Sequence, residues 1–326
     1  MKAIQSVSSP VDTSGRTILC AVLMLLVVAG CFNSQFFSLR YLLLQLQSAA
    51  ILGVIAAGAM LVIITGHIDL SVPWTLTVSA VAACAFAQSA GPDVGAAMSP
   101  LVGLAAGAAI GVVNGFGVAW LRVPSLIWTL AVNAVLLGLN AYFGGGASIG
   151  SHPSALVLQL GGGRLFDLVP NAALIWITVS IAVAFLLRRT VWGRYLHAVG
   201  AREKAAWLSG IDTRKVLLIA FIFSGLASAA AGLLLSGYAG QAYQRMGDPY
   251  LLPGIAAVVV GGTSILGGKG SYSGTVAGVL LITLMSSLLS LLHVPEALKQ
   301  ICYGALIVGT VLVYSRKATA STRAPR

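Results

Sequence analysis

Long uncharged stretches dominate this sequence and restrict the folds that the chain can adopt. Apolar runs of about 16 to 25 residues recur along it, each bounded by charged residues, glycine or proline. An α-helix needs about 20 mostly apolar residues to cross the hydrocarbon core of a bilayer. Hydrophobic residues make up 58% of the chain and charged residues 8%, whereas about a quarter of a soluble domain is charged. We therefore predict an all-α polytopic membrane protein and exclude a soluble globular domain.

Ten apolar runs can be delimited, so we expect a bundle of about ten transmembrane helices. They cover residues 17–32, 41–65, 70–90, 99–121, 125–143, 171–187, 216–238, 251–266, 271–292 and 297–314. The eighth run is short and rich in glycine. Two interpretations of it stay open, because it either crosses the membrane or forms a broken, re-entrant element.

Positive charge sets the expected orientation of the bundle. Lysine and arginine number 19 against 8 acidic residues, a formal net charge of +11, and basic residues collect in cytoplasmic loops of membrane proteins. The densest basic stretch is residues 188–215, with six runs before it and four after it. Both termini then fall on the cytoplasmic side. We expect a cytoplasmic N-terminal segment (1–16), one transmembrane domain (17–315) and a cytoplasmic tail (316–326).

Several other classes of function are excluded by the composition and the motifs. Topology accounts for the positive charge, and the chain shows no aromatic surface on which bases could stack, so we expect no nucleic-acid partner. The patterns His-Glu-x-x-His and Gly-x-Ser-x-Gly are absent, so we expect no catalytic residues. The four cysteines lie in apolar runs, without a histidine at ligand spacing, which predicts packing roles and no metal site. They are Cys20, Cys31, Cys84 and Cys302.

Glycine recurs every fourth residue in two of the runs. On a helix such positions line one face, where a neighbouring backbone can approach closely. We interpret both stripes as helix-packing faces. The stripes are Gly103, Gly107, Gly111 and Gly115, and then Gly270, Gly274 and Gly278.

Residues 261–270, Gly-Gly-Thr-Ser-Ile-Leu-Gly-Gly-Lys-Gly, look like a phosphate-binding loop but lack its spacing. Thr263 stands where the first glycine is needed, and Gly270 stands where a serine or threonine must hold magnesium. The chain therefore carries no ATPase of its own. At membrane depth a glycine-rich backbone needs protein or water around it. The glycines Gly261, Gly262, Gly267 and Gly268 accordingly form either a tight interhelical turn or part of a solute path.

Asp69 is the one acidic residue set closely between two apolar runs. A carboxylate inside a membrane usually has a functional role. An aspartate just before a run, with Pro73 in its first turn, is also typical of a capped helix start. Both interpretations of Asp69 stay open.

The basic stretch 188–215 mixes charged residues with apolar ones, among them Trp192, Tyr195, Leu196, Trp207 and Leu208. Such a mixture predicts a short amphipathic helix. This helix either rests on lipid headgroups or forms a docking site for a cytoplasmic partner.

Three motifs together resemble a known family. They are Gly-His-Ile-Asp-Leu-Ser-Val at 66–72, Gly-Ala-Arg-Glu-Lys-Ala-Ala-Trp-Leu-Ser-Gly-Ile at 200–211, and residues 255–278 around the glycine-rich loop. In this order they resemble the ribose/xylose/arabinose-type permeases of bacterial ABC importers, part of the branched-chain amino acid and monosaccharide permease superfamily. The resemblance covers nearly the whole chain. The sequence departs from it at His67 and Pro73, where family members usually have glycine.

The resemblance implies a permease subunit in the bacterial inner membrane that does no covalent chemistry. It implies a second permease chain, a periplasmic binding protein that delivers a monosaccharide, and a separate cytoplasmic ATPase that binds ATP and magnesium. It also implies that residues 188–215 form the cytoplasmic loop that couples the permease to the ATPase, and that the solute moves by alternating access. The residues assigned to ATPase coupling are Gly200, Glu203, Ala205, Ala206, Ser209, Gly210 and Ile211.

A binding protein already supplies selectivity, so the translocation path needs only modest polar groups. Candidates for these groups are Thr65, Asp69, Ser71, Asn114, Asn133 and Asn140. Related permeases carry branched-chain amino acids or nucleosides, and these solutes stay as alternatives. An ion-coupled secondary carrier is the alternative outside this class, although Asp69 alone would have to carry the coupling.

Overall fold

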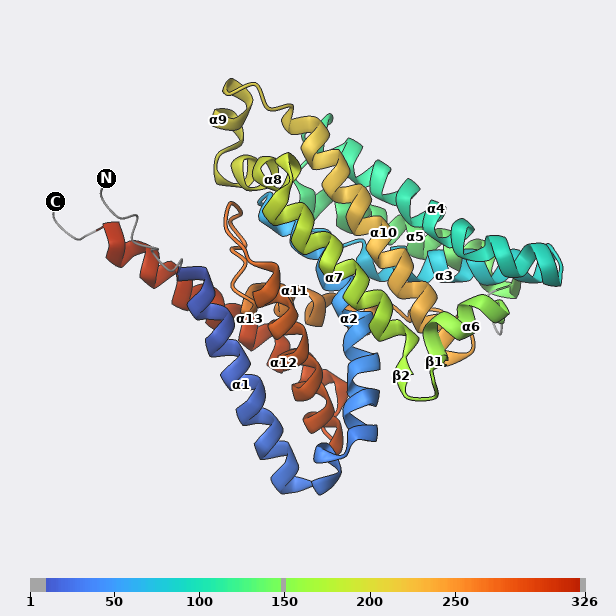
Figure 1. Cartoon of the computed structure of the whole chain (residues 1–326). Helices are drawn as coiled ribbons and strands as arrows, with labels where there is room; N and C mark the ends of the chain where they lie inside the picture. Colours follow the sequence, from blue (N-terminus) through green and yellow to red (C-terminus); the bar gives the residue numbers. More distant parts are fainter. Residues whose placement is uncertain (1–9, 148–150, 323–326) are drawn as a thin grey trace.

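The structure is a computed structural model that describes residues 10–147 and 151–322. Most of the described chain is helical, as predicted for an all-α membrane protein (Figure 1). Within the described residues, seven helices are long and apolar enough to cross a membrane. They are α2 (Leu39–Ile64), α3 (Val72–Ser89), α4 (Pro92–Ala119), α5 (Ser125–Ala147), α7 (Asn171–Arg189), α10 (Thr213–Ala239) and α12 (Tyr272–Leu291).

Helices α1 (Pro10–Phe32) and α13 (Glu296–Thr322) flank this set, packing on α12 and on α11 (Leu251–Val260) respectively. Seven of the ten predicted crossings thus correspond to helices with the length and composition of a membrane span, and the count of ten stays a prediction. The remaining elements are short. They are η1 (Ser34–Phe37), α6 (Ala155–Gly162), the antiparallel strands β1 (Arg164–Leu165) and β2 (Val169–Pro170), α8 (Val191–Ala201), α9 (Glu203–Leu208) and η2 (Asp248–Tyr250).

Polar residues at the starts of several helices explain where those helices begin. The side chains of Ser38, Thr190 and Asp212 each accept a hydrogen bond from a backbone N–H in the first turn of α2, α8 and α10. Such caps satisfy backbone donors that have no partner within the helix. The apolar runs therefore become helices with defined starts.

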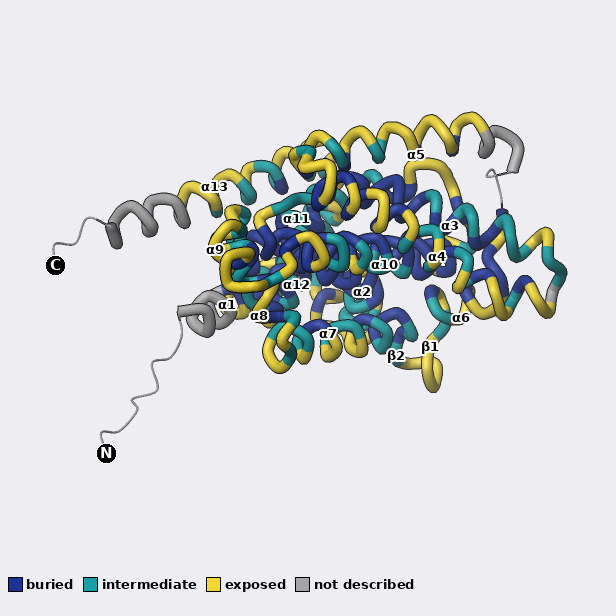
Figure 2. Tube along the Cα trace, turned by 90° about the horizontal axis from the view of Figure 1, so that it is seen from above, coloured by how far each residue is buried: buried dark blue, intermediate teal, exposed yellow. Residues whose placement is uncertain are grey.

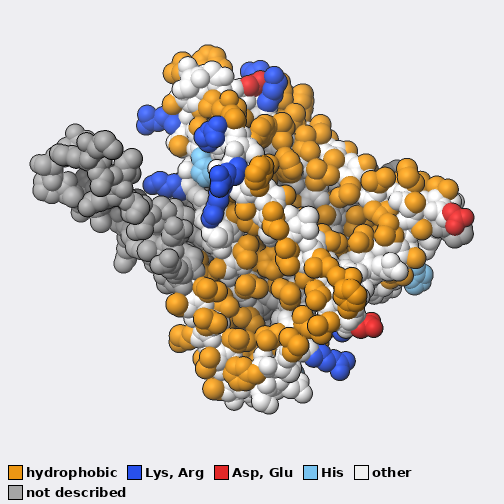
Figure 3. Space-filling model, in the orientation of Figure 1, with side chains coloured by type: hydrophobic (Ala, Val, Ile, Leu, Met, Phe, Trp, Pro, Cys, Tyr) orange, Lys and Arg blue, Asp and Glu red, His pale blue; other side chains and the backbone are white. Residues whose placement is uncertain are grey.

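Helices α2 and α10 form the centre of the bundle. Every residue from Ala49 to Ile64 in α2 is buried, and α2 contacts α7, α10, α11 and α12. Figure 2 shows these two helices inside and the largely exposed helices α5 and α13 along one side. The charged side chains lie elsewhere, because Lys and Arg gather mostly around α8 and α9 on the face in Figure 3.

The α4 glycine stripe lies against α10. A Cβ atom on Gly107 would lie 2.5 Å from the carbonyl oxygen of Gly225, and one on Gly111 would lie 2.6 Å from that of Phe221. These distances are too short for any side chain, so the two backbones meet directly. At the two ends of the stripe, Gly103 faces Leu233 and Gly115 faces Leu218.

Two crossings of the bundle are interrupted by non-helical chain. Residues 66–71 lead back from the end of α2 to α3, and residues 240–247, followed by η2, lead from the end of α10 to α11. Helix α11 has ten residues, about 15 Å at 1.5 Å per residue, or half of a hydrocarbon core of about 30 Å. Helix α11 is therefore too short to span a membrane by itself.

Candidate functional site

Helix α9 lies at one end of the bundle, and we call this end of the molecule the α9 end. The helix presents an apolar surface there. Its Ala206 is 4% exposed, whereas Trp207 and Leu208 are 66% and 78% exposed. The helix therefore packs on the rest of the chain through the small residue Ala206. No other part of the described chain covers the large apolar side chains of Trp207 and Leu208.

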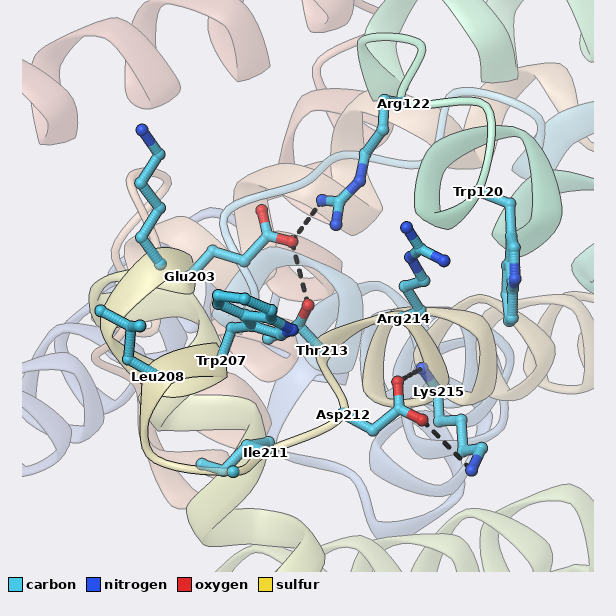
Figure 4. Close-up of a pocket in the computed structure, with 12 residues that line it drawn as sticks. Trp120, Arg122, Glu203, Trp207, Leu208, Ile211, Asp212, Thr213, Arg214 and Lys215 are labelled. Carbon is cyan, nitrogen blue, oxygen red and sulfur yellow. Dashed lines mark hydrogen bonds and ion pairs between the residues drawn. The ribbon is translucent and has the colours of Figure 1, made fainter.

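An ion pair joins α9 to the turn between α4 and α5. Arg122 donates a hydrogen bond to Glu203 Oε1, and the Thr213 hydroxyl donates another to the same atom at 3.2 Å (Figure 4). The Arg122 and Glu203 side chains are 49% and 36% exposed. Such an exposed pair contributes about 0–1 kcal/mol to stability, so its main effect is to link the two segments.

A cavity of about 1080 Å³ opens beside this ion pair. The α4–α5 side contributes Trp120 and Arg122, and α9 with the start of α10 contributes the rest of the wall (Figure 4). Arg214 and Lys215 add positive charge to it. The cavity is therefore an open recess between the α4–α5 turn and α9, with apolar and charged walls.

The other residues assigned to coupling end α9 and fix its position. Gly210 adopts a positive φ of 85°, and the N–H of Ile211 donates back to the Ala206 carbonyl. The Ser209 hydroxyl caps the carbonyl of Ala205 at 2.9 Å. Glycine at such a position ends a helix without steric cost.

Gly200 lies apart from the exposed surface of α9, in a close junction of the three motifs. A Cβ on Gly200 would collide with the Ile64 carbonyl oxygen at the end of α2. The same oxygen accepts a hydrogen bond of 2.8 Å from the N–H of Gly268. Gly66 in turn lies against the backbone of Leu266. Motifs that are up to 200 positions apart therefore meet at the α9 end of the bundle.

The glycine-rich loop that follows α11 forms a tight turn in this junction. Its Gly262, Gly267 and Gly268 have φ values of 92°, 85° and 75°, a conformation that favours glycine. The other glycines of this region make close contacts as well. Gly274 and Gly278 of α12 pack on the backbone of Gly261 and on the Ala257 carbonyl, respectively. Gly270 lies against the side chain of Thr263.

Asp69 is the centre of a buried hydrogen-bond network. Its Oδ1 accepts from the Ser71 N–H at 2.9 Å and from the Ser71 hydroxyl at 2.7 Å. Its Oδ2 accepts from the Ser224 hydroxyl of α10 at 2.7 Å. The N-cap of α3 is Ser71, and Pro73 lies in the first turn. Asp69 therefore shapes the turn before the helix instead of capping the helix directly.

Asn114 of α4 joins this network and leaves one polar atom free. Its Nδ2 donates to the Ser71 hydroxyl at 2.7 Å, whereas its Oδ1 has no hydrogen-bond partner among the described residues. Buried polar atoms normally have partners. Asn133 Oδ1 and Asn140 Nδ2 on α5 are also buried and have no hydrogen-bond partner within the described chain. Thr65 is separate, because it ends α2 and donates to the Val62 carbonyl.

The non-helical backbone at 68–70 obtains its hydrogen bonds from α5. The Ile68 N–H donates to the Ser125 hydroxyl at 3.3 Å, and the Leu70 N–H donates to the Thr129 hydroxyl at 2.9 Å. Irregular backbone inside a membrane is stable only with such partners. The start of α5 therefore holds the segment that carries Asp69.

Sequence reasoning missed Arg122, Ser125, Thr129 and Ser224. Arg122 is the one charge between the fourth and fifth runs, which was a usable signal. The hydroxyl residues carry no local pattern that distinguishes them from ordinary helix residues. No group of three His, Cys, Asp or Glu side chains that could hold a metal ion occurs in the part of the chain that the structure describes.

Long apolar helices with a short exposed helix at one end are typical of a polytopic membrane protein. Residues 41–311 match the family described as branched-chain amino acid transport system / permease component, and the chain belongs to this family. It is thus a permease subunit of an ABC transporter in the inner membrane and not an enzyme, because ATP hydrolysis in such transporters belongs to separate subunits.

Similar proteins of known role cover nearly the whole chain. The ribose import permease protein RbsC of Escherichia coli (strain K12) is 34% identical over 302 residues, which is 92% of this chain and 93% of RbsC. The autoinducer 2 import system permease protein LsrC of Yersinia enterocolitica is 31% identical over 323 residues, covering 99% of this chain and 88% of LsrC. No solved structure matches the chain.

Proposed function

We propose that this chain is the membrane subunit of an ATP-driven importer that receives a monosaccharide from a periplasmic binding protein. The observation that carries this proposal is the exposed apolar surface of α9, tied by Arg122 and Glu203 to the turn that holds the Asp69 segment. The names of the similar proteins RbsC and LsrC describe permeases for the import of ribose and of autoinducer 2. This similarity supports a sugar-like solute.

A cytoplasmic ATPase docks on α9 in this proposal. Trp207 and Leu208 supply an apolar contact, and the neighbouring cavity accepts a side chain of the partner. Large exposed apolar side chains beside basic residues are typical of a protein-binding surface. The α9 end is then cytoplasmic, and the positive charges around α8 and α9 agree with this orientation.

A continuous set of contacts would carry the movement of the ATPase into the membrane. Movement of α9 displaces Glu203 and therefore its partner Arg122, which leads directly into α5. Ser125 and Thr129 of α5 hold the backbone of the Asp69 segment. ATP binding would thus rearrange α5 and α3 together, which is the coupled helix movement that alternating access requires.

A second permease chain covers α5 and α13 in this proposal. These helices lie along the same side of the molecule and are largely exposed (Figure 2). Gly138 of α5 and Gly309 of α13 have open space where a Cβ atom would be. Glycine inside a helix costs about 1 kcal/mol relative to alanine, and close packing on another helix would offset this cost. Exposed small residues share these faces, namely Ala131, Ala134, Gly138 and Ala141, and then Ala305 and Gly309.

Purification of the tagged chain from its own membranes in mild detergent tests the proposed function. We expect an ATPase subunit to copurify, with vanadate-sensitive ATP hydrolysis, and its binding protein can then be screened with sugars, amino acids and nucleosides. A chain that purifies alone, hydrolyses no ATP and moves solute with an imposed ion gradient would instead be a secondary carrier.

Two matched variants sharpen this experiment. Leu208→Glu places a charge on the α9 surface, and we expect it to lose the ATPase subunit. Phe166→Glu changes a side chain that is 91% exposed in the β1–β2 turn, at the opposite end of the bundle (Figure 1). We expect this control to retain the ATPase.

A further inference from the structure

The non-helical segment before α11 carries a run of exposed polar side chains. Ala242, Met246 and Gly247 are buried and anchor it, while Tyr243, Gln244 and Arg245 are exposed. None of these polar residues was predicted to have a role, because the segment falls between two apolar runs.

The position of the segment follows from its two ends. It starts at the end of α10 that lies opposite α9, and it reaches α11, which extends for about 15 Å back toward the α9 end. Gly247 packs against the backbone of Pro73 at the start of α3, and its N–H donates to the Thr77 hydroxyl at 3.2 Å. Arg245 therefore lies within the thickness of the helical bundle, two residues from this contact.

Arg245 has two features that are costly at such a depth. Its side chain is 74% exposed while it pairs with Asp248, Nε to Oδ2, at 2.6 Å. Its backbone has a φ of 63°, which residues other than glycine rarely adopt. Charged side chains in membrane segments face a bundle interior or a water-filled cavity and mark solute pathways. Contact with lipid would therefore not account for an exposed arginine here.

The face that carries Arg245 adjoins the helices we assign to the second permease chain. The segment contacts α3 and continues into α11, α5 packs on α3, and α13 packs on α11. A second chain placed against α5 and α13 would thus enclose Tyr243 to Arg245 between two subunits. This enclosure supplies the water-accessible space that the arginine requires.

We propose that Tyr243, Gln244, Arg245 and Asp248 form the solute-contacting wall of the translocation path and take a neutral polyhydroxylated solute. This inference rests on the proposed function. Arg245 and Asp248 neutralise each other, so neither charge is left to select an ion. The remaining guanidinium N–H groups donate to hydroxyl oxygens, the carboxylate accepts from hydroxyl groups, and the Gln244 amide does both. Tyr243, which is 43% exposed, adds a flat apolar surface for the C–H face of a sugar ring.

Cysteine labelling in the assembled complex tests this path. The four native cysteines are replaced, and Gln244→Cys and Tyr243→Cys are each treated with a positively charged, membrane-impermeant methanethiosulfonate. Ile181→Cys is the matched control, because Ile181 on α7 is 65% exposed on an apolar helix surface. We expect both path variants to react about 100-fold faster than this control, since a charge is strongly disfavoured in lipid.

The outcomes separate this inference from the proposed function. Labelling at the rate of Ile181→Cys in both variants would overturn the aqueous path, even where the ATPase still copurifies with the chain. Slower labelling in the presence of ribose, used as the probe, would support recognition of a polyhydroxylated solute. Slower labelling with leucine and not with ribose would overturn that solute class. Loss of the ATPase with labelling intact would count against the proposed function alone.

Discussion

The Ser224 hydroxyl on α10 donates a 2.7 Å hydrogen bond to the Asp69 carboxylate, although the two residues are 155 positions apart. The other carboxylate oxygen accepts two hydrogen bonds from Ser71. Each oxygen of Asp69 thus holds a different part of the fold. The carboxylate fastens the turn before α3 to the central helix, which a neutral side chain could not do with the same three donors.

Replacement of Asp69 should therefore destabilise the protein more than replacement of Ser224. Asp69→Asn turns an NH₂ group toward hydroxyl donors and leaves buried groups without partners, at a cost of about 1–3 kcal/mol. Ser224→Ala removes one hydrogen bond and should cost about 1 kcal/mol. Thermal unfolding in detergent measures both. Ser273→Ala, at an exposed position on α12, is the control, and equal midpoints for all three variants would contradict this role.

The Arg122–Glu203 ion pair should matter for transport and not for stability. Glu203→Arg places two positive charges together and breaks the link between α9 and the α4–α5 turn. We expect normal membrane insertion, a change of less than about 1 kcal/mol in stability, and ATP hydrolysis without solute uptake. The measurement is the ratio of uptake to ATP hydrolysis in reconstituted vesicles.

The charge-swapped double variant Arg122→Glu/Glu203→Arg provides the control for this pair. It restores the attraction with the charges exchanged, so coupling should return in part. Lys299→Ala removes the ion pair with Glu296 on α13 and should leave coupling unchanged. Normal uptake by Glu203→Arg alone would show that the pair does not transmit movement.

Gly107→Leu should prevent assembly of the bundle. A leucine side chain would occupy the space of the Gly225 carbonyl and of Ala229 on α10, so α4 and α10 could not approach. We expect degradation in the membrane or loss of a monodisperse peak in size-exclusion chromatography. Val112→Leu is the control for folding, because Val112 lies on the same helix and is 44% exposed. An active, monodisperse Gly107→Leu protein would refute the packing role.

Hydrophobic patterning was sufficient to predict the class of fold. An uncharged run of about 20 residues has few alternatives to a membrane helix, and the structure confirms an all-α membrane protein. The interrupted crossings could only be suspected. The Gly-rich sequence in the eighth run indicated a break, and the helix in that run does end at Val260. A second irregular stretch precedes the run, in residues 240–247, where polar residues look like an ordinary loop.

The site was predictable only in part because its contacts are long-range. The order of the three motifs indicated the family, and the family assignment is confirmed. Sequence order could not show that Gly200 packs on Ile64, or that Ser125 holds Ile68. These contacts depend on how helices cross, and no local propensity encodes them. Arg245 was overlooked because its position in the bundle depends on the long-range contact of Gly247 with α3.

Gly138→Leu should weaken the association of two permease chains while leaving each chain folded. The α5 face around Gly138 is open in one chain, and we propose that a second chain packs on it. A leucine there would hold the two helices apart. Cross-linking through Ala134→Cys should give a dimer band that Gly138→Leu abolishes, with Ile181→Leu on α7 as the control. Retention of the dimer band in Gly138→Leu would move the interface elsewhere.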